Sequence, residues 1–262
     1  MATLVMGVLN VTPDSFSDGG RWTDPGRAVD RGLAMVAEGA DVVDVGGEST
    51  RPGARPIDDA EQCRRVLPVI GALAPHVRVS IDTRKAGVAE AAIEAGATLV
   101  NDVSASLWPV AAAAGGSVGW VAMHMQGEPA TMQLDPRYGD VVGEVRAFLV
   151  ARADAARGAG VDEVWIDPGI GFGKTLEHNL ALLRSLAALV GTGLPVAVGT
   201  SRKGFLGALG GGATPDDRLE GSLATAVWAA NQGVAMIRAH DVAATVGAMT
   251  LVGDPPPPRA EP

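Results

Sequence analysis

The chain has 262 residues, a formal net charge of −9 and a single cysteine, Cys63. The acidic balance argues against broad electrostatic binding to nucleic acid or to an anionic membrane, because both require a basic surface. One cysteine excludes an intrachain disulfide framework and fits a reducing compartment. With neither a transmembrane-length apolar run nor the basic leader and cleavage site of a signal peptide, we expect a soluble, cytoplasmic protein.

The length allows one α/β barrel or two smaller domains. No linker divides the sequence, and the only compositional break is the proline-rich segment 254–262. We therefore predict one domain over residues 1–253, followed by a disordered tail over residues 254–262.

Short apolar runs rich in valine and isoleucine alternate with alanine-rich amphipathic stretches, which is typical of repeated βα units around a parallel sheet. The predicted strands cover residues 4–9, 41–45, 77–81, 98–100, 119–123, 163–166, 195–198 and 235–237. The predicted helices cover residues 26–38, 58–72, 86–95, 107–114, 139–159, 177–190, 215–232 and 241–251. Helix 107–114 is the weakest of these, and Gly39, Gly96, Gly160 and Gly233 mark helix ends.

Eight βα units in about 250 residues predict a single (β/α)₈ TIM barrel. An open Rossmann sheet fits less well, because no G-x-G-x-x-G sequence follows the first strand.

Polar residues stand where each predicted strand ends, whereas the helix-to-strand turns carry mostly glycine, alanine, aspartate and proline. Active sites of such barrels lie at the carboxyl ends of the strands, so this asymmetry predicts one functional face. The strand-end residues are Asn10, Asp44, Asp82, Asn101 with Asp102, His124, Asp167, the triplet Ser201, Arg202 and Lys203, and Arg238 with His240.

Several of these residues have a structural interpretation as well. Asn10 and Asp44 could simply order a turn. Asp82 and Asp167 follow Val/Ile runs and would face a barrel mouth with little water, which favours function. His124 alone is more often a packed strand-end histidine than a base.

Lys203 could be a Schiff-base lysine, but neighbouring Arg202 and the acids favour a charge-paired, hydrogen-bonding lysine. Arg238 and His240 alternate along an extended segment, so the pair could flank one anion. Two loops rich in glycine and hydroxyl groups, over residues 12–20 and 46–53, are predicted to be mobile and to close over a substrate.

In order and spacing, these motifs resemble the dihydropteroate synthase family of the folate pathway, from Met6 to about Val246. The matching segments are Met6-Gly-Val-Leu-Asn-Val-Thr-Pro-Asp-Ser-Phe-Ser-Asp-Gly-Gly20, Gly46-Gly-Glu-Ser-Thr-Arg-Pro-Gly53, Ser80-Ile-Asp-Thr83, Asn101-Asp-Val-Ser104, Met123-His-Met-Gln-Gly127, Asp167-Pro-Gly-Ile-Gly-Phe-Gly-Lys174, Ser201-Arg-Lys203 and Arg238-Ala-His-Asp-Val242. The resemblance implies condensation of 6-hydroxymethyl-7,8-dihydropterin diphosphate with p-aminobenzoate, which gives 7,8-dihydropteroate and diphosphate. The family usually forms homodimers.

The resemblance also implies a role for each site residue. The pterin would be bound by Asp44, Asp82, Asn101, Asp167, Lys203 and Arg238, of which Asp82, Asp167, Lys203 and Arg238 are the expected catalytic residues. The p-aminobenzoate pocket would include Thr50, Pro52, Phe172 and Ser201. Diphosphate would be bound by Asn10, Thr50, Arg51, Arg238 and His240, with Mg²⁺ as cofactor near Asn10.

Diphosphate would leave first, and the arylamine would capture the resulting pterin-methylene cation. Two departures from the family are Ala105, where glycine is common, and Ala239, where valine is usual.

Two alternatives remain open. A pterin-binding methyltransferase would share the Asp and Asn contacts to the pterin, but it would not need residues 49–52 or 201–203. A degenerate paralogue kept for binding or scaffolding would show erosion of the two glycine-rich loops, and both are intact.

Overall fold

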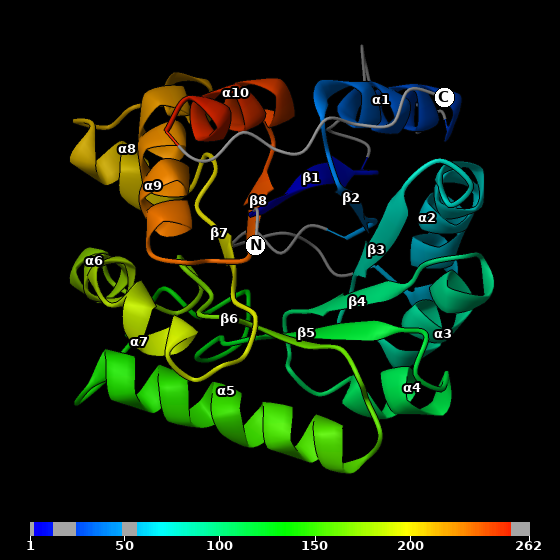
Figure 1. Ribbon diagram of the computed structural model, residues 1–262, viewed down its shortest axis with the longest axis horizontal. Coiled ribbons are helices and arrows are strands. Elements are labelled where there is room, and N and C mark those ends of the chain that lie inside the picture. Colours follow the sequence, from blue (N-terminus) through cyan, green and yellow to red (C-terminus); the bar gives the residue numbers. More distant parts are fainter. Residues whose placement is uncertain (1–2, 13–24, 49–56, 253–262) are drawn as a thin grey trace.

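The computed structural model describes residues 3–12, 25–48 and 57–252, in which strands alternate with helices along the chain (Figure 1). The strands are β1 (Leu4–Asn10), β2 (Val42–Gly46), β3 (Arg78–Asp82), β4 (Leu99–Asp102), β5 (Gly119–Met123), β6 (Val164–Asp167), β7 (Ala197–Gly199) and β8 (Met236–Ala239). The helices are α1 (Pro25–Glu38), α2 (Asp59–Leu73), α3 (Ala86–Glu94), α4 (Trp108–Ala113), α5 (Val141–Gly158), α6 (Leu176–Arg184), α7 (Leu186–Val190), α8 (Gly204–Leu209), α9 (Leu219–Asn231) and α10 (Val242–Val252), with a 3₁₀ turn η2 (Pro215–Asp217).

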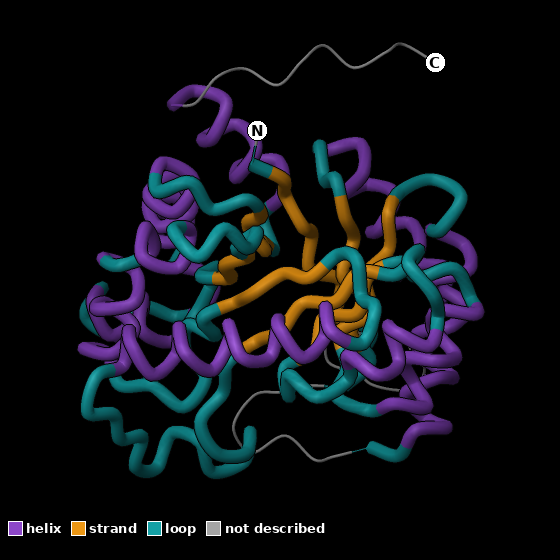
Figure 2. Tube along the Cα trace, turned by 60° about the horizontal axis from the view of Figure 1, so that its bottom comes forward, coloured by secondary structure: helices purple, strands orange, loops and turns teal. Residues whose placement is uncertain are grey.

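The strands form one parallel sheet in the order β6-β5-β4-β3-β2-β1-β8-β7. Its two edges meet through a parallel bridge between Ile166 and Val196, and the Ile166 amide donates to the Pro195 carbonyl over 3.0 Å. The strands lie in the centre of the molecule with the helices outside them (Figure 2). The predicted (β/α)₈ barrel is therefore confirmed.

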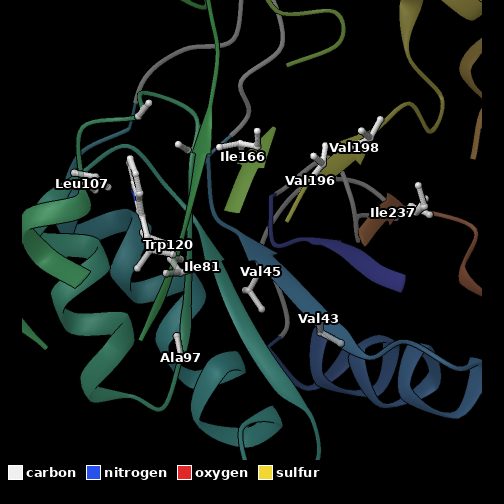
Figure 3. Close-up of a cluster of buried hydrophobic side chains, with 14 of the residues drawn as sticks. Val43, Val45, Ile81, Ala97, Leu107, Trp120, Ile166, Val196, Val198 and Ile237 are labelled. Atoms are coloured by element: carbon white, nitrogen blue, oxygen red, sulfur yellow. The ribbon is translucent and has the colours of Figure 1, made fainter. Parts of the chain in front are cut away.

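Alternation along each strand separates two apolar layers, because successive side chains point to opposite faces. Outward side chains such as Val43, Val45, Ile81, Ile166 and Ile237 pack in the main core (Figure 3). Inside the barrel, a smaller apolar cluster consists of Met6, Val42, Leu99, Val121, Trp165, Ala197 and Met236.

The same alternation explains where the polar strand-end side chains lie. Asp44 is two residues after the inward Val42, and Asn101 is two residues after Leu99. Asp167 and Arg238 stand in the same relation to Trp165 and Met236. The barrel interior is thus apolar near the strand starts and polar near the strand ends. The polar mouth follows from the alternation of side chains along each strand, which repeats every two residues.

Local signals define many of the element ends. Asp58 caps α2 by accepting a hydrogen bond from the Glu61 amide, and Thr175 forms a capping box with His178 at α6. After α3 and α5 the chain turns through Gly96 (φ +112°) and Gly160 (φ +91°), a backbone region that strongly favours glycine.

Two helix predictions need correction, and one helix was missed. The predicted helix 177–190 is two helices, α6 and α7, which meet at Ser185, and both bury leucines against the main core. The predicted helix 215–232 begins as the 3₁₀ turn η2 before α9. Helix α8 was not predicted, and it forms because Phe205 and Leu206 are buried before the glycines from Gly210 stop the helix.

Within residues 3–12, 25–48 and 57–252, no helix is long and apolar enough to cross a membrane. The predicted tail 254–262, most of the predicted loop 12–20 and residues 49–53 of the second loop lie outside the described residues.

Candidate active site

Arg238 links two acids at the mouth of the barrel. From β8, its Nε donates to Asp44 Oδ2 on β2 over 2.6 Å, and its Nη2 donates to Asp82 Oδ2 on β3 over 2.8 Å. Asn101 Nδ2 on β4 donates to the same Asp44 oxygen over 2.9 Å. The ends of β2, β3, β4 and β8 therefore supply one hydrogen-bonded ionic cluster, which spans the end of β1 between β2 and β8.

Burial gives this cluster its electrostatic character. Asp44 is fully buried, and among the described residues nothing donates to its Oδ1. Burial raises the pKa of Asp82 to about 7, although the charge of Arg238 opposes this shift. Burial disfavours the charge of Arg238, but Asp44 and Asp82 outweigh that effect and raise its pKa above the ordinary value. The cluster holds buried acceptors beside a permanent cation.

Asp167 begins a glycine-rich loop that lies against the loop after β5. Its Oδ1 accepts a hydrogen bond from the Gly169 amide over 2.7 Å. A Cβ at Gly169 would lie 1.9 Å from the His124 carbonyl oxygen, and one at Gly173 would lie 2.2 Å from the Gln126 carbonyl oxygen. Only glycine allows this approach, which explains the repeated glycines of the motif.

Lys203 faces this loop from the end of β7. Its Nζ donates to the Ile170 carbonyl and lies 4.4 Å from the centroid of the Phe172 ring. Burial lowers the pKa of Lys203 to about 8, against the attraction of Asp167. Burial raises the pKa of Asp167, and Lys203 is the strongest group opposing that shift. The two side chains therefore form one electrostatic unit.

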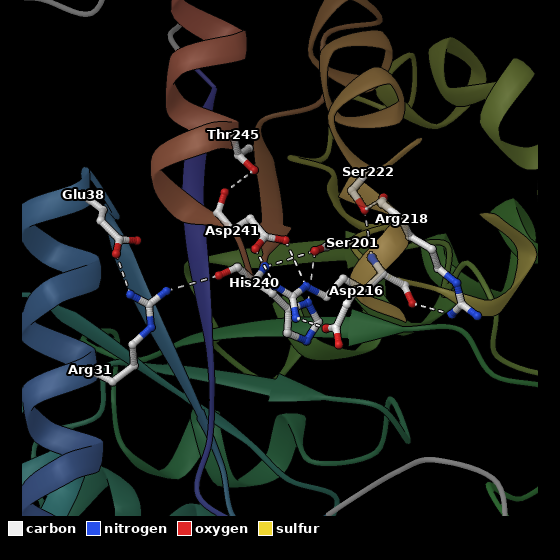
Figure 4. A network of polar contacts seen from close by, with 10 residues as sticks. Arg31, Glu38, Ser201, Asp216, Arg218, Ser222, His240, Asp241 and Thr245 are labelled. Atoms are coloured by element: carbon white, nitrogen blue, oxygen red, sulfur yellow. Dashed lines mark hydrogen bonds and ion pairs between the residues drawn. The ribbon is translucent and has the colours of Figure 1, made fainter. Parts of the chain in front are cut away.

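Ser201 and His240 meet on the β7–β8 side of the mouth (Figure 4). The His240 amide donates to Ser201 Oγ over 3.1 Å, and His240 Nδ1 lies 3.0 Å from the same oxygen. Arg202, between Ser201 and Lys203, adopts a left-handed φ of +57° and pairs with Asp241 at 3.0 and 2.5 Å. Arg202 thus joins the two loops, while its neighbours face the mouth.

The predicted site residues divide into four groups in the structure. One group consists of residues in contact: the cluster of Asp44, Asp82, Asn101 and Arg238, the pair Lys203 and Phe172, and the pair Ser201 and His240. Asp167 is held by the Gly169 amide and is coupled electrostatically to Lys203. Asn10 ends β1 in register with Gly46, and a Cβ at Gly46 would lie 3.6 Å from Asn10 Oδ1 and 3.7 Å from Asp82 Oδ2. Thr50, Arg51 and Pro52 lie outside the described residues.

One strand-end acid belongs to the fold. Asp102 is fully buried and accepts hydrogen bonds from the amides of Ser104, Ser106 and Leu107 and from Trp120 Nε1. It orders the turn before α4. In that turn Ala105 has φ +50°, a conformation that favours the glycine common in the resembling family.

Sequence reasoning missed Lys174, a buried lysine that contacts His124. Burial and the charge of Lys174 lower the pKa of His124 to about 3, so this histidine is neutral near pH 7. It packs edge-on against Phe148 at a centroid distance of 5.0 Å, in agreement with a packed strand-end histidine. The position of Lys174 at the end of the glycine loop was the only signal for it.

No group of three or more His, Cys, Asp or Glu side chains that could hold a metal ion occurs among the described residues. Asn10 offers one oxygen of the kind that Mg²⁺ prefers as a ligand.

The fold and the site define a barrel enzyme with buried acids, an amide and cations at the strand ends. Residues 6–240 match the family model described as pterin binding enzyme. A relative, the dihydropteroate synthase of Mycobacterium leprae, is 51% identical over 95% of this chain and 92% of that protein.

Two solved structures are also similar. The dihydropteroate synthase of Xanthomonas albilineans with 4-aminobenzoic acid has a TM-score of 0.88 and 46% identity, covering 95% of this chain and 92% of that chain. A second structure of that enzyme, in complex with 7,8-dihydropteroate, has a TM-score of 0.85 and 43% identity, covering 95% and 92%. The chain belongs to the pterin-binding enzyme family, in its dihydropteroate synthase branch.

Proposed function

We propose that this chain condenses 6-hydroxymethyl-7,8-dihydropterin diphosphate with p-aminobenzoate to give 7,8-dihydropteroate and diphosphate. The observation that carries the proposal is the cluster of Asp44, Asp82, Asn101 and Arg238 beside Asp167 and Lys203. The two Xanthomonas albilineans complexes, with 4-aminobenzoic acid and with 7,8-dihydropteroate, support the same two substrate classes.

The pterin edge presents adjacent N–H donors, which suit buried carboxylate acceptors. Asp167 has Oδ1 engaged with the Gly169 amide, and its Oδ2 accepts no hydrogen bond from the described residues. In this proposal Asp167, Asp82 and Asn101 read the hydrogen-bonding edges of the ring. Lys203 donates to the ring carbonyl and a ring nitrogen, and Arg238 stacks on the ring face.

The chemistry needs no strong general base, because an arylamine is already nucleophilic when neutral. Loss of diphosphate leaves a pterin-methylene cation, and the buried carboxylates stabilise it electrostatically. We assign diphosphate binding to Asn10, Arg238 and His240, together with Thr50 and Arg51. Mg²⁺ bound by Asn10 and the diphosphate oxygens would neutralise the charge of the leaving group.

The p-aminobenzoate pocket in this proposal includes Phe172 and Ser201, with Thr50 and Pro52. Phe172 supplies an aromatic wall that is held beside Lys203. The homodimer stays a prediction, as does the cytoplasmic location. Light scattering on the purified protein tests the dimer directly.

The purified protein should release diphosphate from the dihydropterin substrate much faster when p-aminobenzoate is present. Removing Mg²⁺ with EDTA should lower the rate, and excess Mg²⁺ should restore it. A coupled diphosphate assay measures both effects, with each substrate omitted in turn as the control. If the Mg²⁺-supplied protein released no diphosphate with both substrates, the proposed reaction would be wrong.

Sulfonamides should compete with p-aminobenzoate, since both present an arylamine to the same pocket. The methyltransferase alternative predicts no such competition, and it predicts methyl transfer from methyltetrahydrofolate to a corrinoid instead. Initial rates at varied p-aminobenzoate and sulfonamide concentrations distinguish the synthase hypothesis from the methyltransferase hypothesis.

Pterin affinity should fall as the pH rises through about 8. Burial lowers the pKa of Lys203 to about 8, so the ammonium that donates to the ring is present below that pH and lost above it. Calorimetry of pterin binding from about pH 6.5 to 9.5 measures the effect, and Lys203→Arg should remove the alkaline decline because arginine stays charged. An identical decline in the arginine variant would assign the titration to another group.

A further inference from the structure

Lys174 is a buried lysine, and within the described part of the chain its ammonium contacts only uncharged groups. It ends the loop after β6 and only 2% of its surface is exposed. Its Nζ lies 3.0 Å from His124 Nδ1, 3.2 Å from the His124 carbonyl oxygen and 3.0 Å from the Phe172 carbonyl oxygen. Three acceptors match the three N–H donors of an ammonium group.

These contacts join two loops at the barrel mouth. His124 directly follows β5, whereas Phe172 and Lys174 belong to the loop after β6. The two backbones lie in close contact at Gly169 and Gly173, as described above, and Tyr138 Oη adds a hydrogen bond to the Gly173 carbonyl over 2.9 Å. Lys174 is thus the cation at the centre of the contact between the two loops.

The opposite side of the β6 loop forms part of the candidate site. Asp167 starts the loop, the Ile170 carbonyl accepts from Lys203, and the Phe172 ring lies beside the Lys203 ammonium. A displacement of this loop would move all three groups together. Lys174 binds the backbone carbonyl of Phe172, the same residue whose ring lies beside Lys203.

We propose that Lys174 is a positioning residue, which holds the β6 loop on the β5 loop so that Asp167, Lys203 and Phe172 are correctly placed for the pterin and the arylamine. The inference rests on the proposed function for its kinetic consequence. The link between Lys174 and His124 does not depend on that function.

The link fixes the tautomer of His124. An ammonium group only donates, so His124 Nδ1 must accept and Nε2 must carry the ring proton. Burial lowers the pKa of Lys174 to about 7 and that of His124 to about 3. Below neutral pH, Lys174 is therefore charged while His124 is still neutral.

Nitrogen-15 NMR of the wild-type protein near pH 6 tests this link without any variant of Lys174. The chain has four histidines, and a His124→Gln sample identifies the resonances that belong to His124. We expect an unprotonated Nδ1 and a protonated Nε2. A proton on Nδ1 at this pH would overturn the contact on which the proposal rests.

The functional test is Lys174→Met, which keeps an unbranched apolar stem of similar shape and removes the ammonium. We expect the Kd and the KM of the dihydropterin diphosphate to rise roughly tenfold, while kcat falls less than about threefold, because the bound substrate already makes these contacts. An unchanged Kd in a folded Lys174→Met protein would refute the positioning role.

Leu73→Ala is the control for general destabilisation. Leu73 is fully buried near the end of α2, which packs against β2 and β3, away from the two loops. This variant should lower the Tm with the pterin Kd unchanged, and an equal rise in Kd in both variants would make the effect of Lys174 merely structural. If the wild-type protein itself bound no pterin, the proposed function would be wrong, whereas the NMR result would stand by itself.

Discussion

Asp167→Asn should remove most of the pterin affinity and leave the protein as stable as before, or more stable. The asparagine oxygen can still accept from the Gly169 amide, which preserves the loop. Its NH₂ group, however, cannot accept the hydrogen bonds that the N–H groups of the pterin edge donate. We expect a loss of roughly 2 to 4 kcal/mol in binding, or about 30- to 1000-fold in Kd, as for other buried charged contacts.

The stability half of this prediction follows from the direction of the pKa shift. Burial raises the pKa of Asp167, so above its ordinary pKa the folded state holds this proton more tightly than the unfolded state. At neutral pH a carboxyl group at this position therefore lowers stability relative to an asparagine, which cannot ionise. Calorimetry gives the Kd, and thermal unfolding at pH 7 gives the stability.

Asp102→Asn is the matched control, because Asp102 is also a strand-end acid. Its oxygens accept from three backbone amides and an indole N–H. In the asparagine variant, an NH₂ group would replace one of these acceptors and would stand opposite N–H donors. We expect a loss of roughly 1 to 3 kcal/mol in stability for each group left unsatisfied. If Asp167→Asn destabilised the protein as Asp102→Asn does, Asp167 would be a structural acid too.

Arg238→Met should abolish turnover and destabilise the fold. The variant leaves the buried Asp44 and the neighbouring Asp82 without their cation. Removing one partner of a buried ion pair costs about 3 to 5 kcal/mol. Denaturant unfolding and the diphosphate assay measure the two effects.

A second substitution separates the two roles of Arg238. Adding Asp44→Asn to Arg238→Met should recover much of the lost stability, because it removes the uncompensated buried charge. It should not recover turnover, since the diphosphate and the pterin face would still lack Arg238. Recovery of activity together with stability would mean that Arg238 serves only the fold.

Arg78→Met is the control for losing a cross-strand ion pair. Arg78 pairs with Glu163 at 2.8 and 2.6 Å near the starts of β3 and β6, at the opposite end of the barrel. Both side chains are about one-third exposed, so the loss should stay below about 1 kcal/mol. Turnover should be unchanged.

The fold could be predicted from the sequence because its signals are local. Valine and isoleucine runs of strand length, separated by amphipathic stretches and glycine ends, recur eight times, and each repeat forms one βα unit of the barrel. The helix predictions were wrong where burial in the tertiary structure overrides the local sequence pattern. Ser185 ends α6 inside a leucine- and alanine-rich stretch, and α8 forms because Phe205 and Leu206 are buried after Lys203.

The candidate site was predictable to the level of residue type and position. The alternation of side chains along each strand makes the strand-end residues Asp44, Asp82, Asn101, Asp167 and Arg238 point inward. They converge because the sheet closes into a barrel. The sequence could not separate Asp102 from its neighbours. Adjacent Asn101 and Asp102 face opposite ways along β4, one toward Asp44 and the other toward the turn before α4.

The sequence by itself determined the barrel, the face that carries the site and the side chains that point into the mouth, because alternation and burial act over a few residues. Only the tertiary structure decided the partners. Arg238 meets Asp44 and Asp82 across 194 and 156 residues of chain, and Lys174 reaches His124 across 50. Such pairings depend on the register and closure of the sheet, since neighbouring strands bring together residues that no local pattern relates.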